Sequence, residues 1–143
     1  MAGTYQYSVG YQSWETPKEL FLNACQEYNI FPKLDVCATK ENTKCPEYFN
    51  SRQDGLSKNW SKTFFCNPPY GDDAAWIQKC YLEHMKNGVS GMALIFAKVD
   101  TRWWHLYVEG KAEVHNHKGR ISFLKGGKKF APSPRPSCWV IWR

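Results

Sequence analysis

The sequence lacks the patterns that define several common classes of enzyme and membrane protein. It contains no glycine-rich phosphate loop, which argues against nucleotide hydrolysis, and it suggests no Ser-His-Asp or Cys-His arrangement for nucleophilic catalysis. No N-terminal signal peptide is visible, and no apolar run approaches the ~20 residues that a membrane helix needs. We therefore expect a cytoplasmic protein that has no membrane partner.

The sequence also lacks the spacing of a metal site. Its six cysteines form no C-x-x-C pair, and its four histidines show no ligand spacing. Several cysteines stand inside apolar runs, as buried free thiols of a reducing compartment do. We therefore predict buried free thiols and no metal site, and we expect His105 to pack or to hydrogen-bond on its own helix.

Length and charge bound what the chain can be. With 143 residues, of which 43% are hydrophobic, it is long enough to fold as one domain with a proper core. Its formal net charge of +6 favours a polyanionic partner. Seven tryptophans indicate either a large aromatic core or some partly exposed rings for stacking. We expect a single domain over residues 1–143, monomeric or homodimeric, that begins with an irregular arm over residues 1–13.

Strand and helix patterns alternate along the chain, which is typical of an α/β fold. Strands are predicted over residues 34–38, 64–66, 91–97, 121–124 and 138–142. Helices are predicted over residues 17–28, 73–86 and 102–109. The last two strands are expected at one edge of the sheet, joined by a basic loop.

Local signals mark where two of the helices begin. Thr16, followed three residues later by Glu19, forms a capping box with Pro17 at the first helical position. Asp100 or Thr101 is expected to cap the third helix. We therefore expect both helices to begin at a side chain that bonds to the first turn.

The apolar strand over residues 64–66 ends in a stiff loop that begins with Asn67. Pro68 biases Asn67 towards an extended backbone, and Pro68 and Pro69 each fix their own φ. The side-chain oxygen of Asn67 and the carbonyl of Pro68 can each accept one hydrogen of an exocyclic amino group such as adenine N6, while Tyr70 stacks on the base. Rigid acceptors help a transition state most, because they need no reorganisation. We predict that these four residues form the catalytic site.

Two acids stand where a ligand or a turn would need them. Asp35 lies inside an apolar strand, which is costly unless the carboxylate is paired. It is therefore either a buried structural acceptor or a ligand group at the carboxyl end of the strand, where doubly wound sheets bind ligands. Asp54, which precedes Gly55, reads by itself as a turn residue.

The Asn-Pro-Pro-Tyr loop after an apolar strand resembles motif IV of the amino methyltransferases, which use S-adenosylmethionine and act on adenine N6, cytosine N4 or a glutamine amide. Over nearly the whole chain, ordered pieces resemble the compact phage-type DNA N6-adenine methyltransferases. These pieces are residues 14–17, 35–39 with Asn42, 54–56, Trp60, 65–71, 100–105 and 119–123. The resemblance implies a compact, truncated Rossmann-like fold with a mostly parallel sheet and helices on both of its faces. It also implies S-adenosylmethionine as cofactor and double-stranded DNA as partner.

The resemblance also implies a set of cofactor contacts. Trp-x-Thr-Pro before the first helix matches motif X, which touches the methionine end of the cofactor, and Asp35 matches the acid of motif I. Asp54 matches the acid that binds the cofactor's adenine, on which Leu56 would pack. The implied cofactor-binding residues are Trp14, Thr16, Pro17, Asp35, Cys37, Ala38, Asp54, Leu56 and Asn67. The Phe-x-Gly-x-Gly loop of the broad superfamily is absent, and the strand continues through residues 37–39 instead.

The C-terminal third is strongly basic. Between residues 111 and 136, Glu113 is the only acid. This segment is either a solvated loop or a surface that contacts phosphates, and the overall charge favours the second. The predicted nucleic-acid contacts are Arg102, Lys118, Arg120, Lys125, Lys128 and Lys129. The chain has no room for a separate target-recognition domain, so sequence specificity is expected to be short, relaxed or supplied by these basic loops.

The favoured function is N6 methylation of an adenine that is flipped out of duplex DNA. Methylation of cytosine N4 or of adenine in RNA remains open, because the loop chemistry does not exclude it. A DNA-binding protein that kept the fold without catalysis also remains open. A glutamine methyltransferase is disfavoured by the basic composition.

Overall fold

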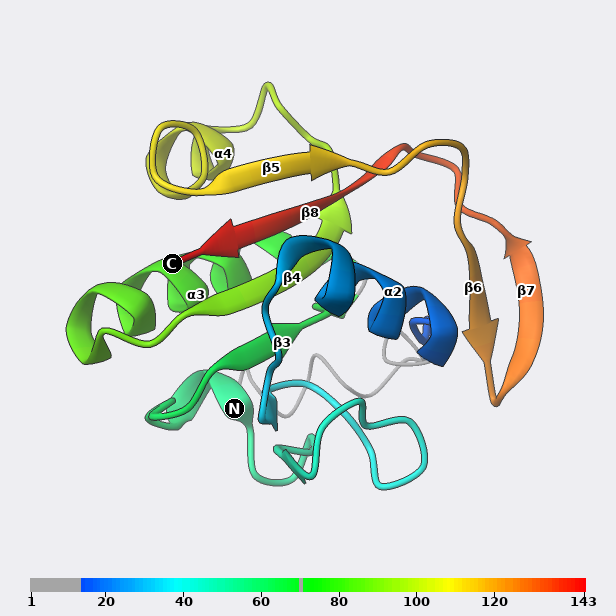
Figure 1. Cartoon of the computed structure of the whole chain (residues 1–143), viewed down its shortest axis with the longest axis horizontal. Coiled ribbons are helices and arrows are strands. Elements are labelled where there is room, and N and C mark those ends of the chain that lie inside the picture. The colour runs from blue at the N-terminus through cyan, green and yellow to red at the C-terminus, as the bar shows by residue number, and fades with distance from the viewer. Residues whose placement is uncertain (1–13, 70) are drawn as a thin grey trace.

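The computed structural model describes residues 14–69 and 71–143, which form a mixed α/β fold (Figure 1). The predicted arm over residues 1–13 and Tyr70 lie outside the described residues. The main sheet consists of β1 (Leu34–Asp35), β2 (Glu47–Tyr48), β3 (Phe64–Cys66), β4 (Gly91–Phe96), β5 (Glu113–Asn116) and β8 (Ser137–Trp142). The other elements are the hairpin strands β6 (Ser122–Lys125) and β7 (Lys128–Pro132), the helices α2 (Lys18–Tyr28), α3 (Asp73–Asn87) and α4 (Arg102–Tyr107), and the short 3-10 helix η2 (Gly55–Ser57).

The main sheet is mostly parallel and contains a switch point. Its strand order is β2-β1-β3-β4-β8-β5, in which β1 to β4 run parallel and β8 runs antiparallel between β4 and β5. The chain leaves β1 outward to β2 and then returns to β3 on the other side of β1. Ligands of open α/β sheets bind outside the carboxyl ends of the strands at such a point. The predicted α/β class is confirmed, and Asp35 and Asn67 stand at the two strand ends that flank the switch point.

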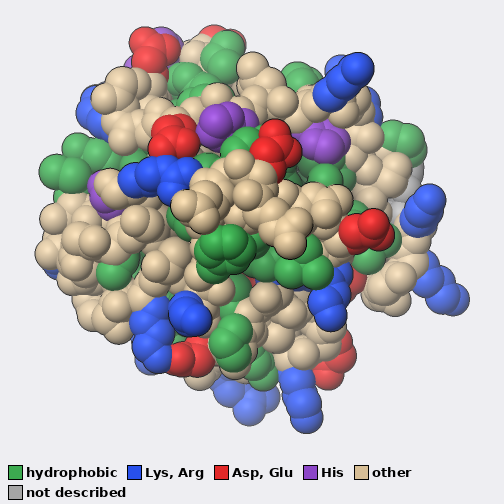
Figure 2. All heavy atoms as spheres, viewed as in Figure 1, with side chains coloured by type: hydrophobic (Ala, Val, Ile, Leu, Met, Phe, Trp, Pro, Cys, Tyr) green, Lys and Arg blue, Asp and Glu red, His purple; other side chains and the backbone are tan. Residues whose placement is uncertain are grey.

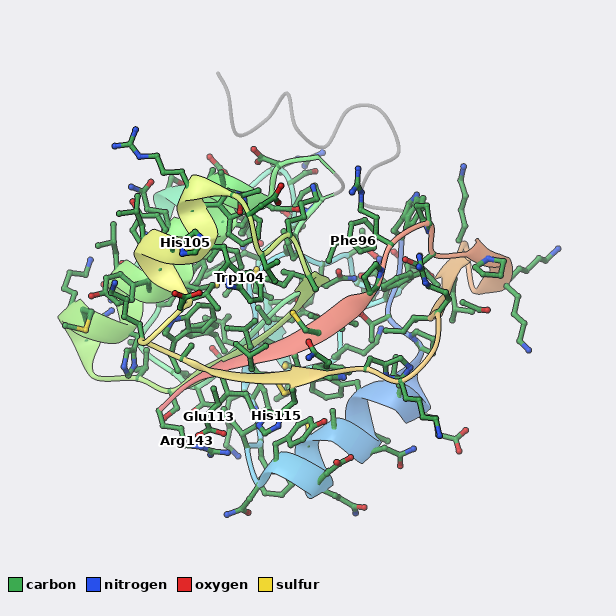
Figure 3. The ribbon with its side chains drawn as sticks, turned by 90° about the horizontal axis from the view of Figure 1, so that it is seen from above. Phe96, Trp104, His105, Glu113, His115 and Arg143 are labelled. Carbon is green, nitrogen blue, oxygen red and sulfur yellow. The ribbon has the colours of Figure 1, made fainter. Side chains whose placement is uncertain are left out.

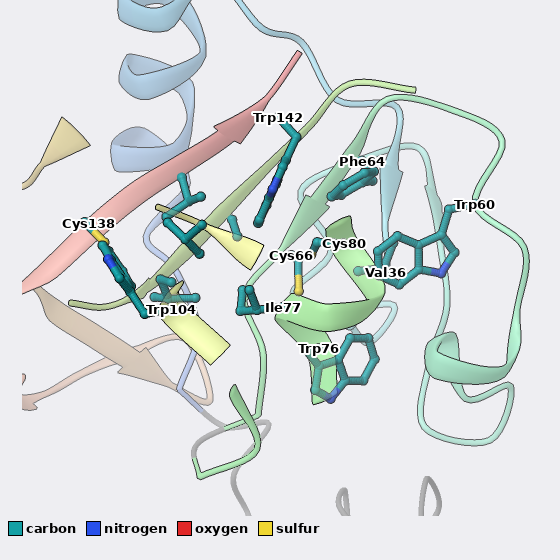
Figure 4. Packing of buried hydrophobic residues seen from close by; sticks show 14 of the residues in the cluster. Val36, Trp60, Phe64, Cys66, Trp76, Ile77, Cys80, Trp104, Cys138 and Trp142 are labelled. Carbon is teal, nitrogen blue, oxygen red and sulfur yellow. The ribbon is translucent and has the colours of Figure 1, made fainter. Parts of the chain in front are cut away.

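Side chains alternate between the two faces of the sheet, because successive residues of a strand point to opposite sides. Helix α2 covers one face, and α3 and α4 cover the other (Figure 1). Under α3 and α4, the rings of Trp60, Phe64, Trp76 and Trp142 pack in one cluster (Figure 4). Most tryptophans therefore build the core rather than a stacking surface. Those that are buried are Trp60, Trp76, Trp104, Trp139 and Trp142.

The packing of Phe64 depends on a glycine in the next strand. Gly91 is the register partner of Phe64, and a Cβ at position 91 would lie 2.0 Å from the Cζ atom of the Phe64 ring. No real Cβ makes so short a contact, so a larger residue here would push the ring out of the core. Gly91 thus allows a fully buried phenylalanine to lie across the strand pair that leads to Asn67.

The first predicted strand is shorter than expected. The sequence predicts residues 34–38, but the ladder ends at Asp35. The backbone bends at Val36 and Cys37, although Val36 N still donates to Phe65 O over 3.0 Å. On the other side, Asp35 O accepts from Phe49 N and Ala38 N donates to Phe49 O, each over 3.0 Å. Two residues separate these two bonds where a regular parallel ladder has one, so the regular ladder ends.

The predicted capping box is wrong. Helix α2 begins at Lys18, and Pro17 is the N-cap, with φ −58° and ψ 135° and no side-chain bond to the helix. The Thr16 hydroxyl is buried instead of capping the first turn. The other cap is confirmed, because Thr101 Oγ1 accepts from Trp104 N over 3.3 Å. Helix α4 ends at Tyr107, earlier than predicted.

The basic C-terminal third does not form the predicted sheet edge. Strand β8 lies inside the sheet, between β4 and β5, and β5 is the edge strand. Strand β6 pairs with β7, in a hairpin that stands to one side of the sheet (Figure 1). No local pattern indicates β5, because Val114 is its only apolar residue and most of its side chains are exposed.

The thiols match their prediction. All six cysteines are free, and all are buried except Cys37, which is partly exposed. His105 Nδ1, on α4, lies 3.5 Å from Glu109 Oε2, which stands two residues beyond the end of that helix. No helix within residues 14–69 and 71–143 is both long and apolar enough to cross a membrane.

Candidate active site

Asn67 is held in a defined orientation directly after β3. Its Nδ2 donates to the carbonyl oxygen of Trp14 over 2.9 Å. Because a carbonyl only accepts, this bond fixes which end of the amide is nitrogen and leaves Oδ1 as the acceptor end. Pro68 and Pro69 are buried behind it. The structure thus supplies a fixed side-chain acceptor at the place where the sequence predicts one.

Two adjoining pockets meet at this loop. Three residues line both of them: Trp14, Asn67 and Pro68. The first pocket is further lined by Glu15, Thr16, Asp35, Cys37, Asn42, Lys44 and Phe65. The second pocket is further lined by Asp73, Leu94, Phe96 and Phe123. One pocket is therefore polar and charged, the other mainly aromatic, and Asn67 stands between them.

The first pocket contains a buried carboxyl group. Asp35 is 2% exposed, and its Oδ2 accepts from Lys44 N over 2.9 Å while Oδ1 accepts more weakly from Cys37 N over 3.4 Å. Burial raises the pKa of Asp35 from 3.8 to about 7, although these two bonds oppose the shift. Burial likewise lowers the pKa of the Lys44 ammonium, against the pull of the Asp35 carboxylate. The first pocket thus contains one acid, Asp35, and one base, Lys44, and burial disfavours the charged form of each.

The first pocket also contains a buried hydroxyl group, that of Thr16. Thr16 is 2% exposed, and its Oγ1 has no hydrogen-bond partner among the described residues. An unsatisfied buried hydroxyl costs on the order of 1–3 kcal/mol, so a polar ligand in the first pocket would recover that free energy.

The second pocket is an aromatic cage. The ring centroid of Trp14 lies 5.9 Å from that of Phe123 and 6.3 Å from that of Phe96. At the rim, Lys98 Nζ lies 2.9 Å from Asp73 Oδ2. Figure 3 shows Phe96 on the side of the molecule that carries the β6–β7 hairpin, away from His105 on α4.

Phe123 reaches the second pocket because the hairpin folds back on the N-terminal segment. Glu15 N donates to Leu124 O over 2.7 Å, and Leu124 N donates to Glu15 O over 2.9 Å. This isolated antiparallel bridge holds Glu15 beside β6. Sequence reasoning missed Phe123, Lys44 and Glu15 as site residues, because no local pattern shows that residues so distant in the chain converge.

Four predicted cofactor residues do not line either pocket. These are Pro17, Ala38, Asp54 and Leu56. Asp54 has φ 58°, and its carboxylate accepts from Leu56 N over 3.3 Å. The next residue, Gly55, packs directly against the backbone of Val36, the first residue after β1. A Cβ at Gly55 would lie 2.2 Å from Val36 O. Asp54 therefore lies beside the carboxyl edge of the sheet, and its contact with a cofactor stays a prediction.

The predicted nucleic-acid residues fall into separate groups. Lys125, Lys128 and Lys129 are exposed on the hairpin, and Lys118 and Arg120 are exposed on the connection that leads into it. Figure 2 shows Lys and Arg side chains projecting from the edge where Figure 1 places the hairpin. Arg102 is exposed at the start of α4, which Figures 1 and 3 place on the other side of the molecule. The structure therefore does not bring Arg102 together with the hairpin lysines.

The fold and the two pockets define an α/β protein whose site lies at the carboxyl edge of a mostly parallel sheet, at a switch point. Residues 7–143 match the model of the family described as DNA N-6-adenine-methyltransferase (Dam). The chain belongs to this family, which confirms the resemblance seen in its motifs. It is similar to the DNA N-6-adenine-methyltransferase of Haemophilus phage HP1 (strain HP1c1), with 26% identity over 133 residues that cover 90% of this chain and 77% of that protein.

Proposed function

We propose that this protein transfers a methyl group from S-adenosylmethionine to N6 of an adenine that is flipped out of double-stranded DNA. The observation that carries the proposal is the position of Asn67, whose oriented amide stands where the two pockets meet. A transfer reaction needs a donor site and an acceptor site that share one reacting point. We further infer that residues 1–143 form a single domain of the compact Rossmann-like class.

The first pocket fits the amino-acid end of the donor. That end carries an ammonium and a carboxylate, and the pocket offers the carboxylate of Asp35, the ammonium of Lys44 and the unsatisfied hydroxyl of Thr16. Bonds between opposite charges that are largely buried are stronger than those in water. S-adenosylmethionine, when bound, supplies an electrophilic methyl group on a sulfonium. We propose that Cys37 also contacts the donor and that Asp54 and Leu56 hold its adenine end.

The second pocket fits a base that has left the duplex stack. The rings of Trp14, Phe96 and Phe123 offer apolar faces, and base–aromatic stacking contributes about 1–3 kcal/mol per base. Enzymes that act on a base inside a duplex read the flipped base in such pockets. Tyr70, which lies outside the described residues, remains the predicted stacking residue beside Asn67.

Asn67 and Pro68 position the amino group. Asn67 Oδ1 and the Pro68 carbonyl each accept one hydrogen from N6, which keeps the nitrogen lone pair out of the ring system and available for reaction. The bond from Nδ2 to Trp14 and the proline-fixed backbone hold both acceptors in place before the base arrives. Preorganised acceptors of this kind need no rearrangement in the transition state.

The β6–β7 hairpin is proposed to contact the DNA backbone. Lys125, Lys128 and Lys129 stand on the same hairpin that supplies Phe123 to the base pocket. Cations placed beside a base pocket would hold the phosphates that flank the flipped nucleotide. Lys118 and Arg120 extend this surface, whereas Arg102 would contact DNA only at a separate place.

The proposal is tested by incubating the protein with S-adenosylmethionine labelled in the methyl group and with unmethylated plasmid DNA. The product is digested to nucleosides, which are then separated. We expect the label in N6-methyladenine nucleoside. Label in N4-methylcytosine would keep the mechanism but change the base, and label only with an RNA substrate would change the partner. Failure to label any nucleic acid, with DNA still bound, would favour a binding protein without catalysis.

A further inference from the structure

We propose that Glu15 is a positioning residue that couples binding of the methyl donor to binding of DNA. The inference rests on the proposed function, since it assigns the first pocket to the donor and the hairpin to DNA. The two oxygen atoms of the Glu15 carboxylate have different partners, one on the hairpin and one at the first pocket.

The Glu15 carboxylate joins the hairpin to the wall of the first pocket. Its Oε1 accepts from Gly127 N over 3.1 Å, and its Oε2 accepts from Asn42 Nδ2 over 3.4 Å. Gly127 forms the turn between the hairpin strands, directly before Lys128. Asn42 and Glu15 both line the first pocket. One side chain therefore contacts the tip of the basic hairpin and the donor pocket at the same time.

Both partners of this carboxylate are themselves held. Asn42 Oδ1 accepts from Thr39 N over 2.7 Å, and Asn42 N donates to Thr39 Oγ1 over 3.2 Å, so the loop that carries Asn42 is closed on itself. On the other side, the backbone of Glu15 pairs with Leu124 in both directions. A change in the position of Glu15 would therefore displace β6, because the two backbones are bonded to each other.

The neighbours of Glu15 serve the other parts of the site. The Trp14 carbonyl orients Asn67, and the Thr16 side chain is buried in the first pocket. Burial lowers the pKa of the Lys44 ammonium, and the negative charge of Glu15, like that of Asp35, partly opposes this shift, so Glu15 acts on the charged groups of that pocket. Residues 14–16 therefore connect the donor pocket, the catalytic amide and the hairpin through consecutive positions.

This arrangement predicts positive coupling. With a donor bound in the first pocket, Glu15 and Asn42 would form part of its wall, and the Glu15 carboxylate would be held in the conformation that binds Gly127. The hairpin lysines are then already ordered when DNA arrives, so DNA binding costs less conformational entropy. By thermodynamic linkage, DNA must strengthen donor binding by the same factor.

The coupling is measured with S-adenosylhomocysteine, which binds without transferring a methyl group. Its affinity is determined by calorimetry with and without a saturating duplex, and the affinity for a fluorescent duplex is determined with and without S-adenosylhomocysteine. In the wild-type protein we expect each ligand to tighten the other by about 5- to 50-fold, within the usual range of such couplings. The two measured factors should agree.

Glu15→Gln leaves one acceptor oxygen for two donors, so one of the two contacts is lost. We expect its coupling factor to fall to about one or two, whatever happens to the separate affinities. Glu19→Gln is the matched control, because Glu19 is exposed in the first turn of α2 and lines neither pocket. If Glu15→Gln does not fold, Asn42→Asp loses the donor to Glu15 while it keeps an acceptor for Thr39 N, and it should also lower the factor.

Each outcome decides the matter. Equal coupling in the wild-type and Glu15→Gln proteins, or no coupling in the wild-type protein, would overturn the role of Glu15 while the proposed function stands. Loss of coupling in Glu19→Gln as well would show a general structural effect and would overturn it too. No binding of S-adenosylhomocysteine under any condition would overturn the proposed function itself.

Discussion

The side-chain amide of Asn67 donates from Nδ2 to the backbone carbonyl of Trp14 over 2.9 Å, across 53 positions of the sequence. This bond ties the loop after β3 to the segment that precedes α2. It determines which end of the amide can accept, and it places that end between a polar pocket and an aromatic pocket. The orientation of the Asn67 amide therefore depends on its contact with the carbonyl oxygen of Trp14.

Phe123→Ala should slow methyl transfer because it weakens binding of the flipped base, and it should leave binding of the methyl donor unchanged. Phe123 lines the second pocket only, so the loss of its ring removes a stacking face. We expect kcat/KM for DNA to fall about 10- to 100-fold, because base–aromatic stacking contributes about 1–3 kcal/mol. Affinity for S-adenosylhomocysteine should stay within about threefold.

The control for this variant is Phe31→Ala, since Phe31 is 57% exposed and lines neither pocket. Assays are run below the temperature at which Phe123→Ala unfolds. If both variants kept the wild-type kcat/KM, the second pocket would not be the base site.

Asp35 should make stability depend on pH in an unusual direction. Its pKa rises from 3.8 to about 7 on folding, mainly through burial. Because the folded carboxyl holds its proton more tightly than the unfolded one, it contributes stability at low pH that is lost as pH rises through about 7. The side chain of Asp35→Asn cannot ionise, so this variant does not lose that stability. Between pH 5 and pH 8, the free energy of unfolding of Asp35→Asn minus that of the wild-type protein should therefore increase by on the order of 2 kcal/mol.

This difference is measured by urea unfolding of both proteins at the two pH values. Comparing the two proteins removes the contributions of groups that they share, such as Glu83 and Glu113, whose pKa values are lowered. A difference that does not change with pH would mean that Asp35 is ionised in the folded protein over the whole range.

The hairpin lysines should set the salt dependence of DNA binding. Each lost phosphate contact lowers the slope of log K against log salt by ~0.9. We expect Lys128→Ala combined with Lys129→Ala to reduce the slope by about 2. The matched control combines Lys33→Ala with Lys111→Ala, which are exposed near the amino-terminal ends of β1 and β5. An equal loss of slope in both double variants would indicate diffuse attraction rather than a hairpin contact.

Gly91→Ala should destabilise the core without altering the site. The new Cβ would lie 2.0 Å from the Phe64 ring, and overpacking of this kind typically costs about 1–3 kcal/mol or more in the free energy of unfolding. Phe64→Leu removes the overlapping ring atoms. The double variant should therefore be more stable than the sum of the two single effects, by roughly 1 kcal/mol or more in urea unfolding. Strict additivity would mean that position 91 tolerates a side chain by moving the backbone.

Local signals in the sequence predicted the elements that carry the catalytic loop. The apolar run of β3 and the prolines after Asn67 act on their own neighbours, so the strand end could be predicted without tertiary information. The same holds for the Thr101 cap, whereas the mostly parallel sheet was expected from the family resemblance. Strand β2 was missed because two residues give no periodic pattern, and β5 was missed because its side chains are polar.

The rest of the site depends on contacts that no local pattern encodes. Phe123 joins the base pocket only because β6 pairs with Glu15, and Lys44 joins the first pocket only because its backbone bonds to Asp35. The capping box at Thr16 failed for the same reason. The local pattern favoured a cap, whereas the tertiary fold buries that hydroxyl in a pocket.

The most direct test of the catalytic role of Asn67 is the single-turnover rate of methyl transfer by Asn67→Ala, at saturating S-adenosylmethionine and DNA. Asn23→Ala, on the exposed side of α2, serves as the control. We expect the rate of Asn67→Ala to fall by about 10²-fold or more, since an oriented group of this kind acts mainly in the transition state, while DNA affinity stays within about threefold. A rate within about threefold of the wild-type value would contradict the assignment of Asn67 as the acceptor for adenine N6.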